Sequence, residues 1–120
     1  MAALGEEHEE LLLSVNGSEA IYAPGLFAVE TASGLWKYVG LGKLREDDAA
    51  RSHGDALALV DRFVDDAELF PEAFYIACRE RHPVYDLLYV LTARRTGSAL
   101  LTVDKRLAAL AKKLGVPLAV

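Results

Sequence analysis

The chain has 120 residues, of which 52% are hydrophobic and 26% are charged, and its net charge is −5. This size and composition predict a single globular domain over residues 1–120 that buries its own core. The lone cysteine, Cys78, excludes an internal disulfide and a thiolate zinc site, and the apolar runs fall short of the ~20 residues that span a membrane, so we expect a cytoplasmic protein with no membrane partner.

The first half of the chain alternates helical and extended patterns. Residues 6–15 place acids before apolar side chains, which predicts a short opening helix that ends at Asn16 and Gly17. Residues 21–23 predict a brief strand, and Pro24 then predicts the start of a helix that runs to Tyr38. Residues 47–63 predict a third helix with a polar outer face.

The second half continues the alternation. Proline near the start predicts helices over residues 71–81 and 83–95, and Gly97 ends the second of them. Residues 99–103 predict a buried strand, followed by a helix over 105–114 and a last strand over 117–120. The order of elements predicts an α/β fold with a mainly parallel sheet, in one domain without repeats or linkers.

Charge is distributed unevenly along the chain. Residues 1–78 carry 5 basic and 15 acidic side chains, whereas residues 79–120 carry 8 basic and 3 acidic ones. The C-terminal third could therefore face phosphates, although its basic residues also suit an ordinary solvated helix surface. The basic residues that fit such a solvated surface are Arg94, Arg95, Lys105, Arg106, Lys112 and Lys113.

Three of the most apolar segments each contain one charged residue, and each time it is a carboxylate. These residues are Glu30, Asp86 and Asp104. Asp104 follows the predicted strand 99–103, at the end where α/β sheets usually bind ligands. Each also has a plain structural explanation, since Asp104 suits the N-cap of the last helix and Asp86 suits a helix's first turn.

Carboxylates that converge near a core repel one another unless a cation neutralises them. Mg²⁺ and Mn²⁺ prefer such oxygen ligands, and Mg²⁺ usually keeps positions for water and phosphate oxygens. A site of this kind can activate water and stabilise developing charge in phosphodiester hydrolysis. The three acids as a set therefore predict a Mg²⁺ or Mn²⁺ site.

Longer motifs surround these acids. They read VYDLLYVLTA over residues 84–93, LLTVDKRL over 100–107 and GVP over 115–117, preceded by APGLFAVETASGLWK over 23–37. Together they resemble a PIN domain of the VapC toxin type, over roughly residues 4–120. The resemblance implies a three-layer α/β/α fold and a Mg²⁺- or Mn²⁺-dependent endoribonuclease, normally a homodimer silenced by a cognate antitoxin. It also implies that Glu30, Asp86 and Asp104 bind the metal and that Thr102 is an accessory polar group.

The chain departs from the family pattern at its start. PIN domains usually open with an apolar strand that ends in an aspartate, whereas here no aspartate precedes Asp47. We therefore expect the central first strand to be missing, a gap between the strands at 21–23 and 99–103, and weaker cation binding than in a complete homologue.

Other residues carry less information. His8, His53 and His82 share no spacing that predicts a metal site or general base, and His82 alone lies near Asp86. Trp36, Tyr38, Phe74 and Tyr75 are expected in the core or at a dimer contact, and Cys78 as a small buried hydrophobe.

Two functions fit these patterns. The first is a toxin ribonuclease whose acids hold the metal and whose Arg94, Arg95, Lys105 or Arg106 contacts the RNA substrate. The second is a PIN-like module that has lost catalysis and serves protein or RNA binding.

Overall fold

The computed structural model describes residues 20–119, so the predicted helix at 6–15 and the expectation about the first strand lie outside the described residues. The described part forms an α/β fold of helices around short parallel strands. The elements in order are β1 (Tyr22–Pro24), α2 (Leu26–Gly40), α3 (Glu46–Ala58), β2 (Arg62–Val64), α4 (Asp66–Glu80), α5 (Val84–Thr96) and α6 (Lys105–Lys113).

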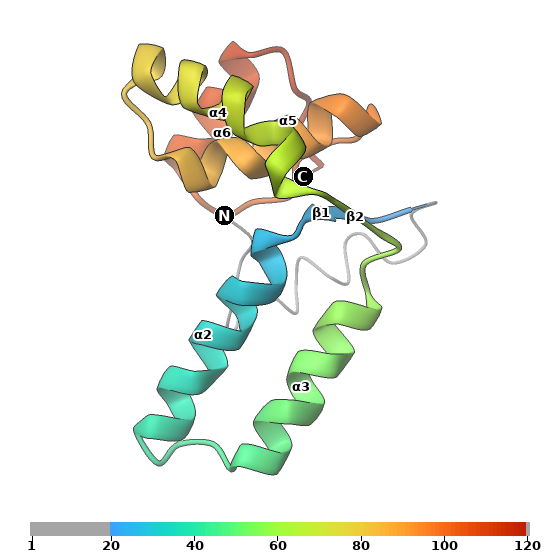
Figure 1. Cartoon of the computed structure of the whole chain (residues 1–120), viewed down its shortest axis with the longest axis vertical. Coiled ribbons are helices and arrows are strands. Elements are labelled where there is room, and N and C mark those ends of the chain that lie inside the picture. The colour runs from blue at the N-terminus through green and yellow to red at the C-terminus, as the bar shows by residue number, and fades with distance from the viewer. Residues whose placement is uncertain (1–19, 120) are drawn as a thin grey trace.

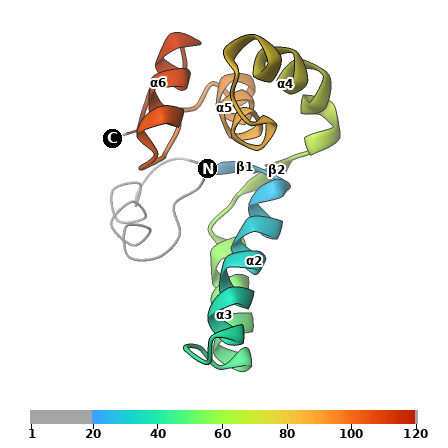
Figure 2. The ribbon, with the colours of Figure 1, turned by 90° about the vertical axis from the view of Figure 1, so that its left-hand side faces the viewer.

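The molecule has two visible parts. Helices α2 and α3 pack on each other as a hairpin that projects from a body made of α4, α5 and α6 (Figures 1 and 2). Strands β1 and β2 lie where the hairpin joins the body, and α5 packs against both α4 and β1. None of the described helices is long and apolar enough to cross a membrane.

Helix α5 is the centre of the core. Every residue from Leu87 to Ala93 is buried, and Leu69 of α4 and Leu107 of α6 are buried against the same cluster. A helix that is apolar on all sides needs such cover from its neighbours. Its bounds agree with the prediction, with Gly97 adopting the left-handed conformation that ends helices.

The sheet is parallel, as predicted, but shorter. Tyr22, Ala23 and Pro24 pair with Arg62, Phe63 and Val64 in parallel register. The predicted strands at 99–103 and 117–120 reduce to a single parallel bridge between Leu100 and Leu118. Within residues 20–119, these two pieces of sheet are not joined to each other.

Two predicted helices were placed wrongly. The helix predicted over 47–63 ends at Ala58, because residues 62–64 pair with β1 instead and bury Val64. Helix α4 begins five residues before Pro71, because the side chain of Asp65 accepts a hydrogen bond from the amide of Ala67 and caps the helix there. Pro71 therefore lies inside the helix, although we expected it at the start.

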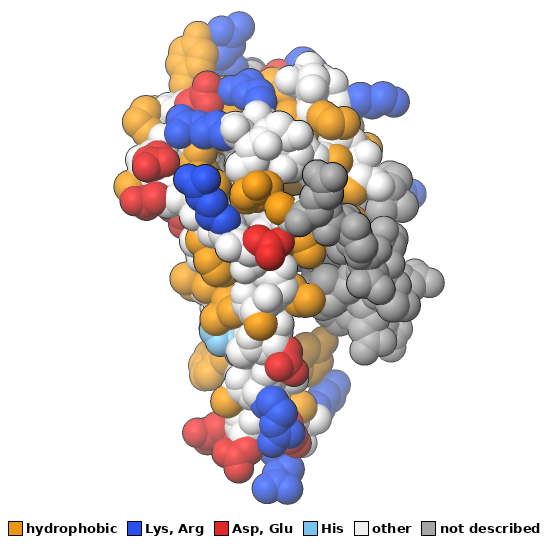
Figure 3. Space-filling view, turned by 90° about the vertical axis from the view of Figure 1, so that its right-hand side faces the viewer, with side chains coloured by type: hydrophobic (Ala, Val, Ile, Leu, Met, Phe, Trp, Pro, Cys, Tyr) orange, Lys and Arg blue, Asp and Glu red, His pale blue; other side chains and the backbone are white. Residues whose placement is uncertain are grey.

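Four aromatic residues, which the sequence places in the core or at a dimer contact, are exposed, and so is the cysteine. Trp36 is 72% exposed and Phe74 is 64% exposed, and Tyr38 and Tyr75 also face solvent, so none of them is a core residue. Cys78 is exposed as well, which corrects its prediction as a buried hydrophobe. Hydrophobic side chains are visible on the surface of the projecting hairpin in Figure 3.

Candidate active site

Glu30 lies in the second turn of α2 and is half-buried. Its Oε1 accepts a hydrogen bond from the hydroxyl of Tyr89, a buried residue of α5. The next residue, Thr31, is buried, and its hydroxyl donates to the carbonyl of Phe27 within the same helix at 2.8 Å. The Tyr89 contact thus ties the carboxylate of α2 to the helix that carries Asp86.

Asp86 lies in the first turn of α5, where its charge interacts favourably with the helix dipole. Its Oδ2 is 2.9 Å from Nε2 of His82, and the two side chains are 18% and 4% exposed. His82 precedes α5 and lies in the connection from α4. Because the ring is enclosed, it holds the Asp86 carboxylate in one orientation.

Asp104 is the N-cap of α6, as its structural explanation required. Its Oδ1 accepts from the amides of Arg106 at 2.9 Å and Leu107 at 3.1 Å. The Leu107 amide above all, helped by that of Arg106 and by nearby His82, lowers the pKa of Asp104 from its ordinary value, against the opposing effect of partial burial. The amide of Asp104 donates to Thr102 Oγ1 at 3.1 Å, so the accessory residue contacts this turn.

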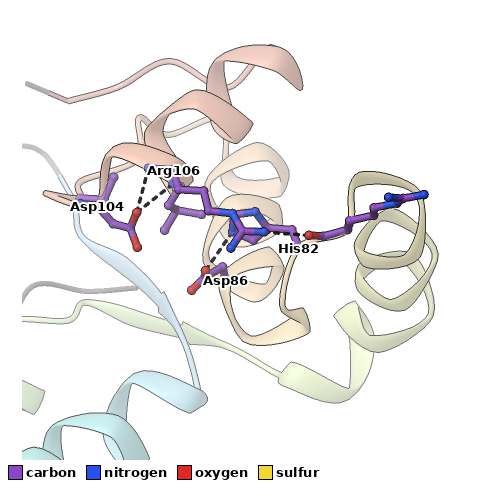
Figure 4. A network of polar contacts seen from close by, with 7 residues as sticks. His82, Asp86, Asp104 and Arg106 are labelled. Atoms are coloured by element: carbon purple, nitrogen blue, oxygen red, sulfur yellow. Dashed lines mark hydrogen bonds and ion pairs between the residues drawn. The ribbon is translucent and has the colours of Figure 1, made fainter.

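A chain of polar contacts joins the turns that carry Asp104 and Asp86 (Figure 4). The guanidinium of Arg106 donates to the carbonyl of Arg81 at 2.8 Å, and Arg81 is followed by His82, which contacts Asp86. Asp86 and Asp104 therefore belong to one network, although they come from different helices.

The donor types of the three acids fit a hard divalent cation, because all three are carboxylates. The geometry is less complete. Among residues 20–119, no group of three or more His, Cys, Asp or Glu side chains lies close enough to hold a metal ion. Glu30 accepts a hydrogen bond from Tyr89, which lies on the helix that carries Asp86, and Arg106 connects the turn of Asp104 to the residue before His82.

The four basic residues predicted to contact RNA differ in their surroundings. Arg94 forms an ion pair with Glu72 at 2.7 Å, and Arg95 donates to the carbonyl of Glu68 at 3.1 Å. Both lie in the last turn of α5, about 12 Å along the helix from Asp86 at 1.5 Å per residue. Lys105 is exposed beside Asp104. Lys and Arg side chains gather over part of the helical body in Figure 3.

Sequence reasoning missed two residues of this site. The sequence did not predict a role for Tyr89, although its place three residues after Asp86 puts it on the same helix face. His82 was noted for its nearness to Asp86 but was not assigned a contact. The spacing of four residues between His82 and Asp86 was the signal for this contact. The structure shows that the His82 ring is buried beside the carboxylate.

The family model for the PIN domain matches residues 2–113 of the chain. The chain belongs to the PIN domain family. Glu30, Asp86 and Asp104 all lie inside this match, as do Tyr89, His82 and Arg106.

A curated relative is similar over most of the PIN domain. It is Ribonuclease VapC3 of Pyrobaculum aerophilum, which is 32% identical over 105 residues, covering 86% of this chain and 80% of the relative. The resemblance stated from the motifs, to a PIN domain of the VapC type, is thereby confirmed.

Proposed function

We propose that this PIN domain is a metal-dependent endoribonuclease and the toxin of a toxin–antitoxin pair. The observation that carries the proposal is that α5 contacts or carries two of the three acids. Tyr89 donates a hydrogen bond to Glu30 of α2, and the first turn of the same helix carries Asp86, whose partner His82 follows the residue that Arg106 contacts. The similarity to a ribonuclease over 86% of the chain supports the same activity.

The chain's own residues have distinct roles in this proposal. Glu30, Asp86 and Asp104 hold Mg²⁺ or Mn²⁺, Tyr89 and His82 fix two of these carboxylates, and Thr102 supports the turn before Asp104. When bound, the ion supplies Lewis-acid stabilisation and lowers the pKa of a water. Asp104, like any aspartate near neutral pH, presents a carboxylate, and the amides at the start of α6 lower its pKa further.

Exposed cations place the RNA. Lys105 follows Asp104 directly and is exposed, so it is best situated to meet a phosphate next to the scissile bond. Arg94 and Arg95 are already engaged with α4 and lie at the far end of α5, so they contribute to a wider contact. Arg106 was also predicted to contact RNA, but its guanidinium already donates a hydrogen bond to the Arg81 carbonyl.

The partners of the proposed toxin are a cognate antitoxin and a second copy of this chain. Helix α4 suits self-association, because Phe70, Phe74 and Tyr75 are exposed along it. Its exposed acids, Asp65 and Glu68, lie at one end and its exposed bases, Arg79 and Arg81, at the other. Two copies of α4 packed antiparallel about a two-fold axis would bury the aromatic residues and set acids against bases.

The experiment that tests the activity is cleavage of a labelled single-stranded RNA after the protein has been stripped with a chelator. Cleavage that is absent without metal and restored by Mn²⁺ or Mg²⁺ supports the proposal. Cleavage that persists in excess chelator contradicts it.

A second candidate function is a PIN module that binds RNA or protein without cleaving. It is favoured by the finding that, within residues 20–119, three ligands do not gather into a metal group. RNA binding with no cleavage at any Mn²⁺ or Mg²⁺ concentration would select this alternative.

A further inference from the structure

The connection between α4 and α5 carries His82, which contacts the candidate metal ligand Asp86. Arg81, the C-cap of α4, has a φ of 53°, and it is the one non-glycine residue with positive φ in residues 20–119. A non-glycine residue in this region is unfavourable and is retained where its surroundings fix it. Here the His82 amide donates to the Ala77 carbonyl at 3.1 Å, which closes the turn.

Helix α6 fixes this turn from the other side. The guanidinium of Arg106 donates to the Arg81 carbonyl at 2.8 Å, while the Arg106 amide donates to Asp104 Oδ1 at 2.9 Å. Arg106 therefore contacts the Asp104 side chain through its backbone and the α4–α5 turn through its side chain (Figure 4). Lys113, at the end of α6, also reaches α4 through Glu80 at 2.6 Å.

The α4–α5 turn also fixes the orientation of Asp86. His82 is buried and its Nε2 is 2.9 Å from Asp86 Oδ2, so the position of residues 81–82 sets the orientation of the Asp86 carboxylate. Asp104 is thus connected to Asp86 by three hydrogen bonds, through the backbone amide and the guanidinium of Arg106 and then through His82, the residue that follows Arg81 in the chain. The affinity for a cation held by both acids would depend on their spacing. Hydrogen bonds that orient metal ligands typically contribute 10–100-fold to metal affinity.

We infer that Arg106, acting with His82, is a positioning residue that sets the spacing of the Asp86 and Asp104 carboxylates for the cation, and does not contact RNA. This inference rests on the proposed metal-dependent function. It assigns a different role to a residue that the sequence places among the RNA-binding cations, because the guanidinium of Arg106, although the residue is exposed, donates a hydrogen bond to the Arg81 carbonyl.

The test compares Arg106→Gln and Arg106→Lys with Lys105→Gln and with Lys112→Gln, an exposed residue near the end of α6. Mn²⁺ binding is measured without RNA, from the loss of the free-ion electron paramagnetic resonance signal. RNA cleavage is then measured against both Mn²⁺ and RNA concentration, and thermal unfolding shows whether each variant is folded.

We expect Arg106→Gln to weaken Mn²⁺ binding about tenfold and to leave the KM for RNA at saturating Mn²⁺ within twofold of the wild type. Arg106→Lys should recover part of the loss, because an ammonium can still donate to the Arg81 carbonyl. Lys105→Gln should show the reverse pattern, with a raised KM and normal Mn²⁺ binding, and Lys112→Gln should change neither.

Normal Mn²⁺ binding in folded Arg106→Gln overturns the inference, whether the KM for RNA rises or stays constant. If Arg106→Gln does not fold, Arg106→Lys is compared with Lys112→Gln. Equal Mn²⁺ affinity in the two variants, combined with a raised KM for RNA in Arg106→Lys, assigns Arg106 to RNA binding. A wild-type protein that neither binds Mn²⁺ nor cleaves RNA overturns the proposed function itself, and that result is seen before any variant is compared.

Discussion

The hydroxyl of Tyr89 donates a hydrogen bond to the carboxylate of Glu30, and this contact joins α5 to α2 across 59 residues of sequence. It couples the body of the molecule to the projecting hairpin one turn after Asp86 in α5. The position of Glu30 therefore depends on the packing of two separate elements.

Removing this hydroxyl should weaken both the fold and the site. We expect Tyr89→Phe to lower the free energy of unfolding by about 1–2 kcal/mol, because the bond has a charged acceptor and lies partly out of solvent. Urea unfolding measures this loss. Cleavage at limiting Mn²⁺ should fall more than cleavage at saturating Mn²⁺, since a less fixed Glu30 binds the cation less well. Tyr85→Phe is the matched control, because Tyr85 lies on the same helix and is exposed; equal effects of the two substitutions would contradict the role of Tyr89.

The N-cap of α6 should make stability depend on pH. The folded-state pKa of Asp104 is lowered, first by the Leu107 amide, so the charged carboxylate stabilises the protein above the pKa of an unfolded aspartate. This contribution is lost as the pH falls through the lowered folded-state pKa.

Two substitutions separate the charge from the cap. Asp104→Ala should cost about 1 kcal/mol at neutral pH through loss of the cap. Asp104→Asn keeps a capping oxygen, so its stability difference from the wild type should shrink as the pH is lowered from 7 toward 3. Denaturant unfolding across this range measures both, and a difference that grows on acidification would contradict the assignment.

Lys105 should contribute to RNA binding more than Arg94 does, because Arg94 is paired with Glu72 and lies at the far end of α5. In an Asp86→Asn background, Lys105→Gln should lower RNA affinity and reduce the slope of log affinity against log salt by about 0.7, the value for one contact to a single strand. Fluorescence anisotropy with a labelled RNA gives both quantities. A larger loss of slope for Arg94→Gln would place the RNA across α4 and α5 instead.

The aromatic surface of α4 should control the oligomeric state. Phe74→Asp puts a charge among the residues proposed to be buried in a dimer, so light scattering should show the mass of one chain where the wild type shows two. Trp36→Asp, at an equally exposed aromatic position on the hairpin, should leave the dimer intact. Cys78 lies on α4 and is exposed, so a bis-maleimide should cross-link the wild-type protein but not Phe74→Asp. A wild-type protein of single-chain mass contradicts this account of α4.

Local signals in the sequence predicted much of the fold. Pro83 and Gly97 marked the two ends of α5, because proline suits the start of a helix and glycine suits the left-handed residue at its end. Strand β2 was missed because it is three residues long, two of them exposed, and exists only through pairing with residues 22–24. The exposure of Cys78 was also missed, and Phe74 was left open between the core and a dimer contact, because composition does not say which face of α4 meets the core.

The site was predictable in part. Glu30, Asp86 and Asp104 stood out as single carboxylates in apolar segments, and the cap formed by Asp104 was anticipated from its place before a helix. Their supports were not, because the Tyr89–Glu30 and Arg106–Arg81 bonds join residues 59 and 25 positions apart. Such contacts depend on tertiary packing, which local patterns do not encode.

The most direct test of the central claim is cleavage of a labelled RNA in Mn²⁺ by the wild type, by Asp86→Asn and by Asp55→Asn, an equal substitution at an exposed position of α3. We predict cleavage by the wild type and by Asp55→Asn, and a loss of at least a hundredfold in Asp86→Asn, about 2.7 kcal/mol of transition-state stabilisation. Equal cleavage by all three proteins would contradict the claim that Asp86 belongs to the active site of this PIN domain.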